Sequence, residues 1–159
     1  MRKVCLAVGV VCAFAGPAFA QSDNVHFPMT ARPLPAGAVS PTGNPAFSAA
    51  VLAGDNLYIS GSTDLDPATG KPPGDAKTGA KLILDHMKGT VERAGMTMDD
   101  LVWVQVFASD LSNYAVFNEV YRSYFKGPLP ARAFLGAGSL LTNAHFEVMG
   151  IAVKSKLKR

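Results

Sequence analysis

Cysteine is nearly absent from this 159-residue chain, and the positions of the two cysteines decide which chemistry remains open. Both Cys5 and Cys12 fall in the first 20 residues, so the rest of the chain can form no disulfide and offers no thiol nucleophile or thiolate ligand. The three histidines, His26, His86 and His145, are scattered and match no metal-ligand spacing. We therefore predict no metal and no cofactor, and we expect His145 to face solvent or to satisfy a local backbone group.

The apolar run at the N-terminus is shorter than the roughly 20 residues that a membrane-spanning helix needs. The first 20 residues are instead typical of a secretory signal peptide. Met1-Arg2-Lys3 carries positive charge, residues 4–16 are apolar, and Ala18-Phe19-Ala20 is a small-x-small cleavage site. We predict cleavage before Gln21 and a periplasmic or secreted mature protein with no membrane contact. The alternative is that this segment stays uncleaved as an N-terminal anchor.

A strong charge of one sign is also lacking once the signal peptide is removed. Loss of Arg2 and Lys3 leaves 13 basic residues against 12 acidic ones, a net charge near +1. Phosphate contacts need a basic surface, so the sequence predicts no nucleic-acid partner and argues against ribonuclease activity. A short basic segment, residues 155–159, is expected to be a solvated tail.

Proline and hydrophobic periodicity divide the mature chain into an arm and a domain. Residues 21–45 hold five prolines, which disfavour helix and predict an extended or irregular arm. The domain is predicted over residues 46–154. Alternating apolar residues predict strands, and apolar residues at three- and four-residue spacing predict helices. The predicted elements are strands at 47–53 and 56–60, a surface loop at 64–75, a helix from Asp75 to Gly95, a strand at 101–108, a helix from Asp110 or Ser112 to Gly127-Pro128, and strands at 131–136 and 146–153.

This order predicts an α+β fold, a mixed sheet with both helices on one face. The second helix carries an aromatic stripe, Tyr114, Phe117, Tyr121 and Tyr124, which we interpret as core. The helix-free face of the sheet is apolar as well. With no further helices to cover it, this face is expected to meet another subunit.

Two charged residues stand inside apolar strands. Arg132 is flanked by Ala131 and Ala133, and Glu147 lies at the start of the last strand. A buried charge is costly unless a partner or a ligand satisfies it. From spacing alone, a structural ion pair between the two and a ligand site remain equally open.

Several short segments stand in a fixed order between residues 47 and 153. They are Ile59-Ser60-Gly61, Val106-Phe107 with Asp110-Leu111, Asn118 with Tyr121 and Phe125, Pro130-Ala131-Arg132, and Glu147 with Ile151-Ala152-Val153. No single segment is specific, but the ordered set covers most of the mature chain. In order and spacing it resembles the RidA/YjgF family of reactive-intermediate deaminases.

The resemblance implies a chorismate-mutase-like subunit that assembles as a homotrimer, with ligand sites in clefts between subunits. It also implies hydrolysis of small 2-enamino and 2-imino acids to 2-keto acids and ammonia. Arg132 matches the family's carboxylate-binding arginine, whose planar fork can hold a carboxylate with two hydrogen bonds. Glu147 matches the acid that orients water. Ser60 and the backbone near Phe134 match the wall of the cleft, and Ser60 and Gly61 are expected to bind substrate.

Two positions depart from the family pattern. Phe47 stands where many members have a tyrosine, and Phe134 stands where many have a cysteine. Both should line the substrate site and make it more apolar, and Phe134 should also fill it. The alternative function is therefore a non-enzymatic trimeric module that binds small carboxylates or holds other proteins.

Overall fold

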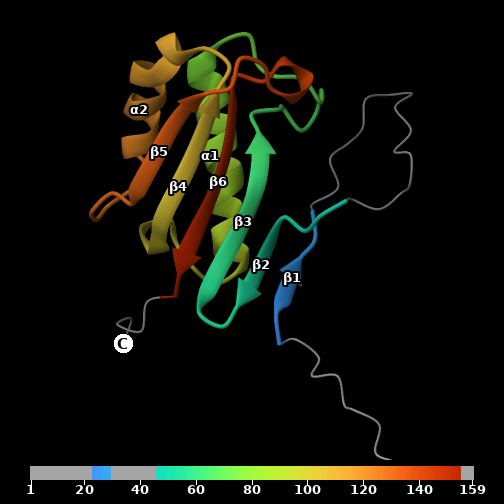
Figure 1. Ribbon diagram of the computed structural model, residues 1–159, viewed down its shortest axis with the longest axis vertical. Coiled ribbons are helices and arrows are strands. Elements are labelled where there is room, and N and C mark those ends of the chain that lie inside the picture. Colours follow the sequence, from blue (N-terminus) through green and yellow to red (C-terminus); the bar gives the residue numbers. More distant parts are fainter. Residues whose placement is uncertain (1–22, 30–45, 155–159) are drawn as a thin grey trace, which may run out of the picture.

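The computed structural model describes residues 23–29 and 46–154, which form one six-stranded mixed sheet and two α-helices (Figure 1). The sheet order is β1-β2-β3-β6-β4-β5. Only β4 and β5 pair in parallel, and the other neighbours are antiparallel. The strands are β1 Val25–Phe27, β2 Ala50–Ala53, β3 Asn56–Thr63, β4 Leu101–Ala108, β5 Ala131–Gly136 and β6 Phe146–Val153, and the helices are α1 Ala76–Arg93 and α2 Tyr114–Arg122.

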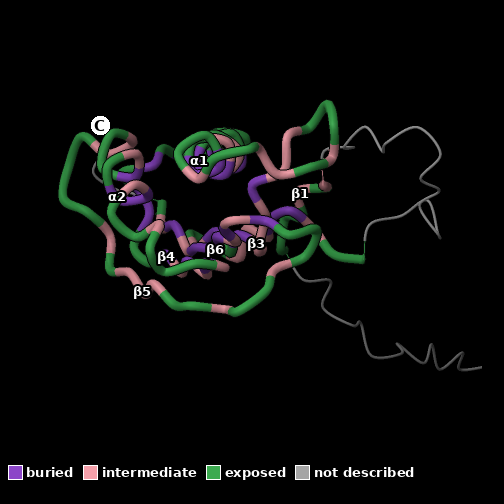
Figure 2. Tube along the Cα trace, turned by 90° about the horizontal axis from the view of Figure 1, so that it is seen from above, coloured by how far each residue is buried: buried purple, intermediate pink, exposed green. Residues whose placement is uncertain are grey.

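Both helices lie on one face of the sheet, as predicted, and the buried residues concentrate between the two layers (Figure 2). Burial of apolar area between these layers is the main stabilising contribution. The core joins the helix-facing side chains of the central strands to the apolar stripe of α1 and to the aromatic residues of α2. Its fully buried large side chains include Leu57, Ile83, Leu84, Val91, Val104, Val106, Phe117, Phe146 and Val148.

Helix α1 begins and ends where the sequence predicts. The Asp75 side chain accepts a hydrogen bond from the backbone amide of Thr78 and caps the N-terminus. This bond and the one from the Thr78 hydroxyl hold the pKa of Asp75 below its ordinary value. At the other end Gly95 has a φ of 71°, which glycine adopts without the penalty of a Cβ.

Helix α2 ends earlier than predicted. A 3₁₀ turn over Leu111–Asn113, capped by Asp110, leads into the helix, but the helix stops at Arg122 and not at Gly127-Pro128. The Ser123 hydroxyl donates to the Val120 carbonyl at 2.6 Å, and backbone bonds of the i→i−3 type follow as far as residue 125. The last residues of the predicted helix are therefore tighter turns.

Part of the proline-rich arm belongs to the sheet. Val25–Phe27 forms β1, which pairs antiparallel with β2 and contains no proline. Edge position suits such a short strand, because only one side needs hydrogen-bond partners. The predicted signal peptide, the rest of the predicted arm (residues 21–22 and 30–45) and the predicted basic tail lie outside the described residues.

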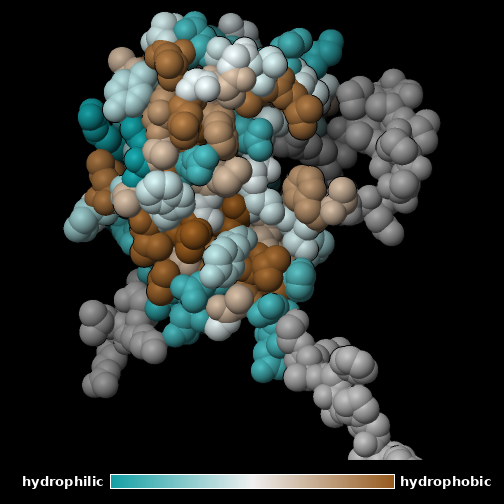
Figure 3. All heavy atoms as spheres, in the orientation of Figure 1, coloured by the Kyte–Doolittle hydropathy of each residue, from teal (hydrophilic) through white to brown (hydrophobic). Residues whose placement is uncertain are grey.

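The register of the sheet assigns each strand residue to a face. On β4, Val104 and Val106 are buried toward the helices, while Trp103 and Phe107 point to the helix-free face. Apolar side chains gather over that face (Figure 3), and among them Tyr58 is 49% and Trp103 37% exposed. The predicted second apolar face is therefore present. Within the described residues, neither helix is long and apolar enough to cross a membrane.

Candidate functional site: an arginine pocket and an acid pocket

Arg132 lies on the helix side of the sheet, beneath α2. Parallel pairing places it beside Val104, whose side chain faces the helices. Its Nη2 donates a 2.6 Å hydrogen bond to Oδ1 of Asn118, which is buried on α2. Its Cζ lies 4.6 Å from the centroid of the Tyr121 ring, a cation–π contact. Asn118 and the aromatic ring thus hold the guanidinium in place.

The same pocket contains two buried polar groups that have no hydrogen-bond partner among the described residues. They are Nη1 of Arg132 and the hydroxyl of Tyr121. Burial raises the pKa of Tyr121 to about 12, and the positive charge of Arg132 opposes part of that rise, so the phenol stays protonated at neutral pH. Unsatisfied buried donors are costly and call for an explanation. A ligand carboxylate, which accepts several hydrogen bonds, would satisfy them.

A hollow of about 240 Å³ opens beside the guanidinium, lined in part by Tyr114, Asn118, Tyr121 and Arg132. The predicted aromatic core stripe is therefore only partly core, because Tyr114 is 49% exposed at this hollow. We call this set of residues the arginine pocket. The segment with Asn118 and Tyr121 was a sequence signal for it, but sequence reasoning did not assign either residue to the site.

Phe134 lies on the same side of β5 as Arg132, within a cluster of aromatic rings. Its ring centroid is 5.0 Å from that of Tyr114 and 5.5 Å from that of Phe117, and Cζ of Arg132 lies 5.6 Å from it. The edge-on arrangement with both rings is favourable. Phe134 thus fills the space next to the guanidinium, as expected for a phenylalanine at this position.

Glu147 lies on the opposite, helix-free face. It pairs with Thr63 on β3 and with Phe107 on β4, and its carboxylate rests over Gly61. A Cβ at Gly61 would lie 3.3 Å from Cδ of Glu147 and even closer to Oε1, so only glycine leaves room for the carboxylate. Phe47 stands at the rim of the same cavity, which has a volume of about 390 Å³. We call this set the acid pocket.

An ion pair between Arg132 and Glu147 is ruled out within one subunit. The two side chains project from opposite faces of the sheet, and Arg132 is hydrogen-bonded to Asn118 instead. Spacing along the chain could not reveal this, because the face depends on the registers of two different strand pairs. Each charge therefore serves a separate pocket.

The structure separates Ser60 from both pockets. Its hydroxyl donates a 2.7 Å hydrogen bond to the carbonyl of Ser48, which ties β3 to the segment before β2. Ser60 lines a third hollow of about 310 Å³ on the helix-free face, together with Tyr58, Trp103 and Met149. Of the predicted substrate-binding residues, Phe47 and Gly61 thus accompany Glu147, Phe134 accompanies Arg132, and Ser60 stands apart.

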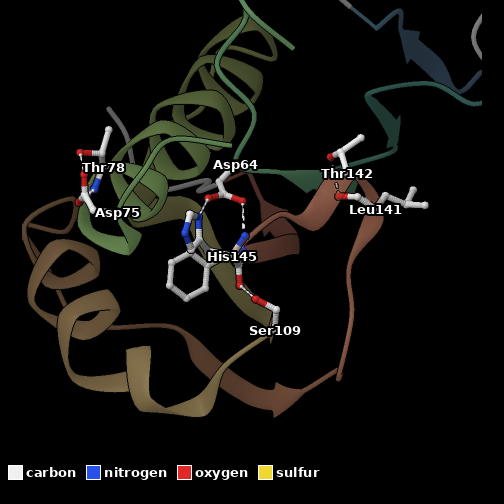
Figure 4. A network of polar contacts seen from close by, with 8 residues as sticks. Asp64, Asp75, Thr78, Ser109, Leu141, Thr142 and His145 are labelled. Atoms are coloured by element: carbon white, nitrogen blue, oxygen red, sulfur yellow. Dashed lines mark hydrogen bonds and ion pairs between the residues drawn. The ribbon is translucent and has the colours of Figure 1, made fainter. Parts of the chain in front are cut away.

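A buried carboxylate beside the acid pocket was not predicted from the sequence. Asp64 is fully buried, although the loop it begins was expected on the surface, and it accepts hydrogen bonds from the amides of His145 and Phe146 (Figure 4). Its other oxygen lies 2.8 Å from Nδ1 of His145. The expectation that His145 faces solvent or a local backbone group is therefore wrong. His145 directly precedes β6 and lies two residues before Glu147, and Asp64 directly follows β3. The pair therefore holds the start of β6 against the end of β3.

No group of three histidine, cysteine or acidic side chains in the described part of the chain is arranged to hold a metal ion. The arginine pocket can bind an anion, and the acid pocket can orient water and transfer a proton.

Comparison with known proteins shows which family the chain resembles. The family model described as endoribonuclease L-PSP matches residues 38–154. A RutC family protein of Pyrococcus horikoshii is 35% identical over 109 residues, which cover 68% of this chain and 86% of the relative. The rat 2-iminobutanoate/2-iminopropanoate deaminase is 34% identical over 110 residues, covering 69% of this chain and 80% of the relative.

Solved structures give the same result. Escherichia coli TdcF with bound serine superposes with a TM-score of 0.67 at 30% identity and covers 80% of this chain and 98% of that one. RidA from an Antarctic Psychrobacter gives a TM-score of 0.65 at 33% identity, covering 69% and 89% of the two chains. The fold predicted from the sequence is confirmed, and the chain belongs to the endoribonuclease L-PSP family, which includes the RidA-type deaminases.

Proposed function

We propose that this protein hydrolyses 2-enamino and 2-imino acids to 2-keto acids and ammonia, in clefts between the subunits of a homotrimer outside the cytoplasm. The observation that carries the proposal is the buried Nη1 of Arg132, which has no hydrogen-bond partner in the described part of the chain. It lies next to a hollow, and Asn118 holds the guanidinium in place. A preformed cationic donor of this kind suits a substrate carboxylate. The names of the rat and Escherichia coli relatives support the reaction class.

The placement of the pockets favours a shared site. Because Arg132 and Glu147 lie on opposite faces of one sheet, one substrate molecule cannot contact both within a subunit. The proposed site requires a neighbouring copy that covers the apolar helix-free face and places its own arginine pocket at the edge of the acid pocket. Burial of residues such as Tyr58 and Trp103 would favour that association.

The two charges divide the chemistry between them. Arg132 holds the substrate carboxylate, which fixes the position of the imine carbon C2. Glu147 takes a proton from a water whose oxygen bonds to C2 and passes it to the imine nitrogen, so that the C2–N double bond becomes a single bond. In the collapse of this carbinolamine, Glu147 takes the proton of the C2 hydroxyl and gives it to the nitrogen as the C2–N bond breaks, which releases ammonia and the 2-keto acid.

The direct test is an assay of the purified protein with imino acids generated in place from amino acids by an amino-acid oxidase. We expect faster appearance of the 2-keto acid than in buffer alone. Arg132→Ala and Glu147→Gln should each remove the acceleration. Glu92→Gln, on the exposed surface of α1, is the matched control and should retain full activity. Equal rates for the wild type and both site variants would reject the proposal.

One observation favours the alternative of a binding module without turnover. Phe134 packs against the guanidinium and reduces the space for a substrate to move between steps. Calorimetry with a 2-keto acid separates the two functions. Binding that depends on Arg132, together with no catalysis by the wild type, would establish the binding module.

The proposed location rests on the composition of the first 20 residues. The mass of the protein recovered from the periplasm or the medium is expected to correspond to a chain that begins at Gln21. A protein retained in the cytoplasm with its first residues intact would contradict this part of the proposal.

A further inference from the structure

The walls of the acid pocket are mainly apolar around a single charge, although Ser62, Thr63 and Thr142 also line it. Met29, Phe47, Leu65 and Leu141 contribute to its lining, and Glu147 is the only charged side chain among the described residues that line it. A substrate carboxylate would find no cation there and would be repelled by Glu147. The carboxylate end of a substrate therefore belongs to the arginine pocket, which leaves the acid pocket for the opposite end of the molecule.

The rim of the pocket presents large apolar side chains to solvent. Leu141 is 78% exposed and Phe47 is 54% exposed. Leu141 stands on a tight turn and points away from the Asp64–His145 pair (Figure 4). The next two residues, Thr142 and Asn143, have φ values of 59° and 57°. Left-handed backbone at two successive non-glycine residues is strained, and such strain persists where the surroundings enforce it, often at ligand sites.

The size of the cavity indicates what could fill it. Its volume of about 390 Å³ lies within the range of small-molecule sites. The methyl group of the alanine-derived 2-imino acid would contact few of the wall atoms and would leave Phe47 and Leu141 exposed. A branched or aromatic side chain would bury them and gain dispersion contacts.

We propose that this chain acts preferentially on 2-imino acids with large apolar side chains, and that Phe47 and Leu141 determine this preference. The inference rests on the proposed function. In the bound substrate the carboxylate lies in the arginine pocket, C2 lies next to Glu147, and the apolar side chain lies against Phe47 and Leu141. Both residues are specificity-determining, and neither takes part in proton transfer.

The test compares kcat/KM of the purified protein for the imino acids derived from alanine, leucine and phenylalanine. A single methylene group in an apolar pocket changes kcat/KM by about 10-fold or more, so we expect at least a 10-fold preference for the two larger substrates. Leu141→Ala and Phe47→Ala should each lower kcat/KM for the leucine-derived substrate about 10-fold more than kcat/KM for the alanine-derived one. Leu111→Ala, an exposed leucine outside this cavity, is the matched control and should change neither value.

The possible outcomes distinguish the substrate preference from the proposed deaminase function on which it rests. Catalysis of the alanine-derived substrate as fast as, or faster than, the larger ones would overturn the preference and leave the deaminase function standing. No acceleration with any substrate would reject the function. If Leu141→Ala lowered all rates equally and broke the oligomer in light scattering, the rim would be a subunit contact and the inference would be wrong.

A binding measurement keeps the inference testable without turnover. Calorimetry should show 4-methyl-2-oxopentanoate binding at least about 10-fold more tightly than pyruvate, because only the former carries a branched side chain. Leu141→Ala should bring the two affinities together. Equal affinities in the wild type would contradict the proposed role of the apolar rim.

Discussion

Gly61 is the position where the smallest substitution should have the largest effect on catalysis. Replacing it with alanine places a Cβ 3.3 Å from Cδ of Glu147 and closer still to Oε1, and 3.4 Å from Cε of Met149. The Glu147 carboxylate must therefore move by roughly 1 Å, a misplacement that typically costs about 100-fold in rate. Gly61 is not among the glycines with positive φ, so its backbone accepts alanine and the fold should survive.

The assay for Gly61→Ala is kcat for 2-imino acid hydrolysis, with urea unfolding of the same preparation. We expect kcat to fall about 100-fold while the binding of a 2-keto acid through Arg132 changes little. Gly89→Ala is the matched control, because nothing lies within 4 Å of its Cβ. It should leave kcat unchanged and raise stability by about 1 kcal/mol, since Gly89 lies inside α1. Unchanged kcat in a folded Gly61→Ala protein would refute the catalytic placement of Glu147.

Three further predictions concern the residues that support the two pockets. Tyr121→Phe should raise the free energy of unfolding at pH 7 by about 1 kcal/mol, because it removes a buried hydroxyl without a partner. Burial raises the pKa of folded Tyr121 to about 12. Below pH 10 the phenol is protonated in both the folded and the unfolded state, but between pH 10 and 12 only the unfolded state loses the proton, so the free energy of unfolding of the wild type should fall by roughly 2 kcal/mol. Urea titrations should show a smaller fall for Tyr121→Phe. Asp64→Ala should lower the free energy of unfolding by about 3 kcal/mol in urea, because the His145 ring and two backbone amides lose their hydrogen-bond partner. A decrease below about 1 kcal/mol would contradict this stabilising role of Asp64. Asn118→Ala should raise KM about 10-fold more than it lowers kcat, because it frees the Arg132 guanidinium without touching Glu147; an effect on kcat alone would show that Asn118 does not position the arginine.

Local patterns were sufficient to predict most of the fold. The bounds of β4, β5 and β6 are those predicted, because each strand alternates or runs apolar between clear breaks. The start of α1 followed from the change of apolar period at Asp75 and its end from Gly95. Strand β1 was missed because its three residues lie within a proline-rich segment that carries no periodic signal.

The site could be predicted only as a set of residues. The family resemblance identified Arg132 and Glu147 as site residues. The face of the sheet on which each side chain lies depends on strand registers that the sequence does not specify. The contact between Asp64 and His145 joins residues 81 positions apart and has no local signature. Asn118 was visible in the sequence, yet its role became clear only when α2 was placed over β5.

The central claim is that each site takes Arg132 from one subunit and Glu147 from a neighbour. The most direct test mixes Arg132→Ala and Glu147→Gln chains in equal amounts by co-expression, and measures kcat of the mixed oligomers against each pure variant. If sites form between copies in a closed trimer, about one quarter of them regain both residues, so the mixture should show about one quarter of wild-type activity. Activity no higher than that of the pure variants, in oligomers shown by mass spectrometry to contain both chains, would contradict the account.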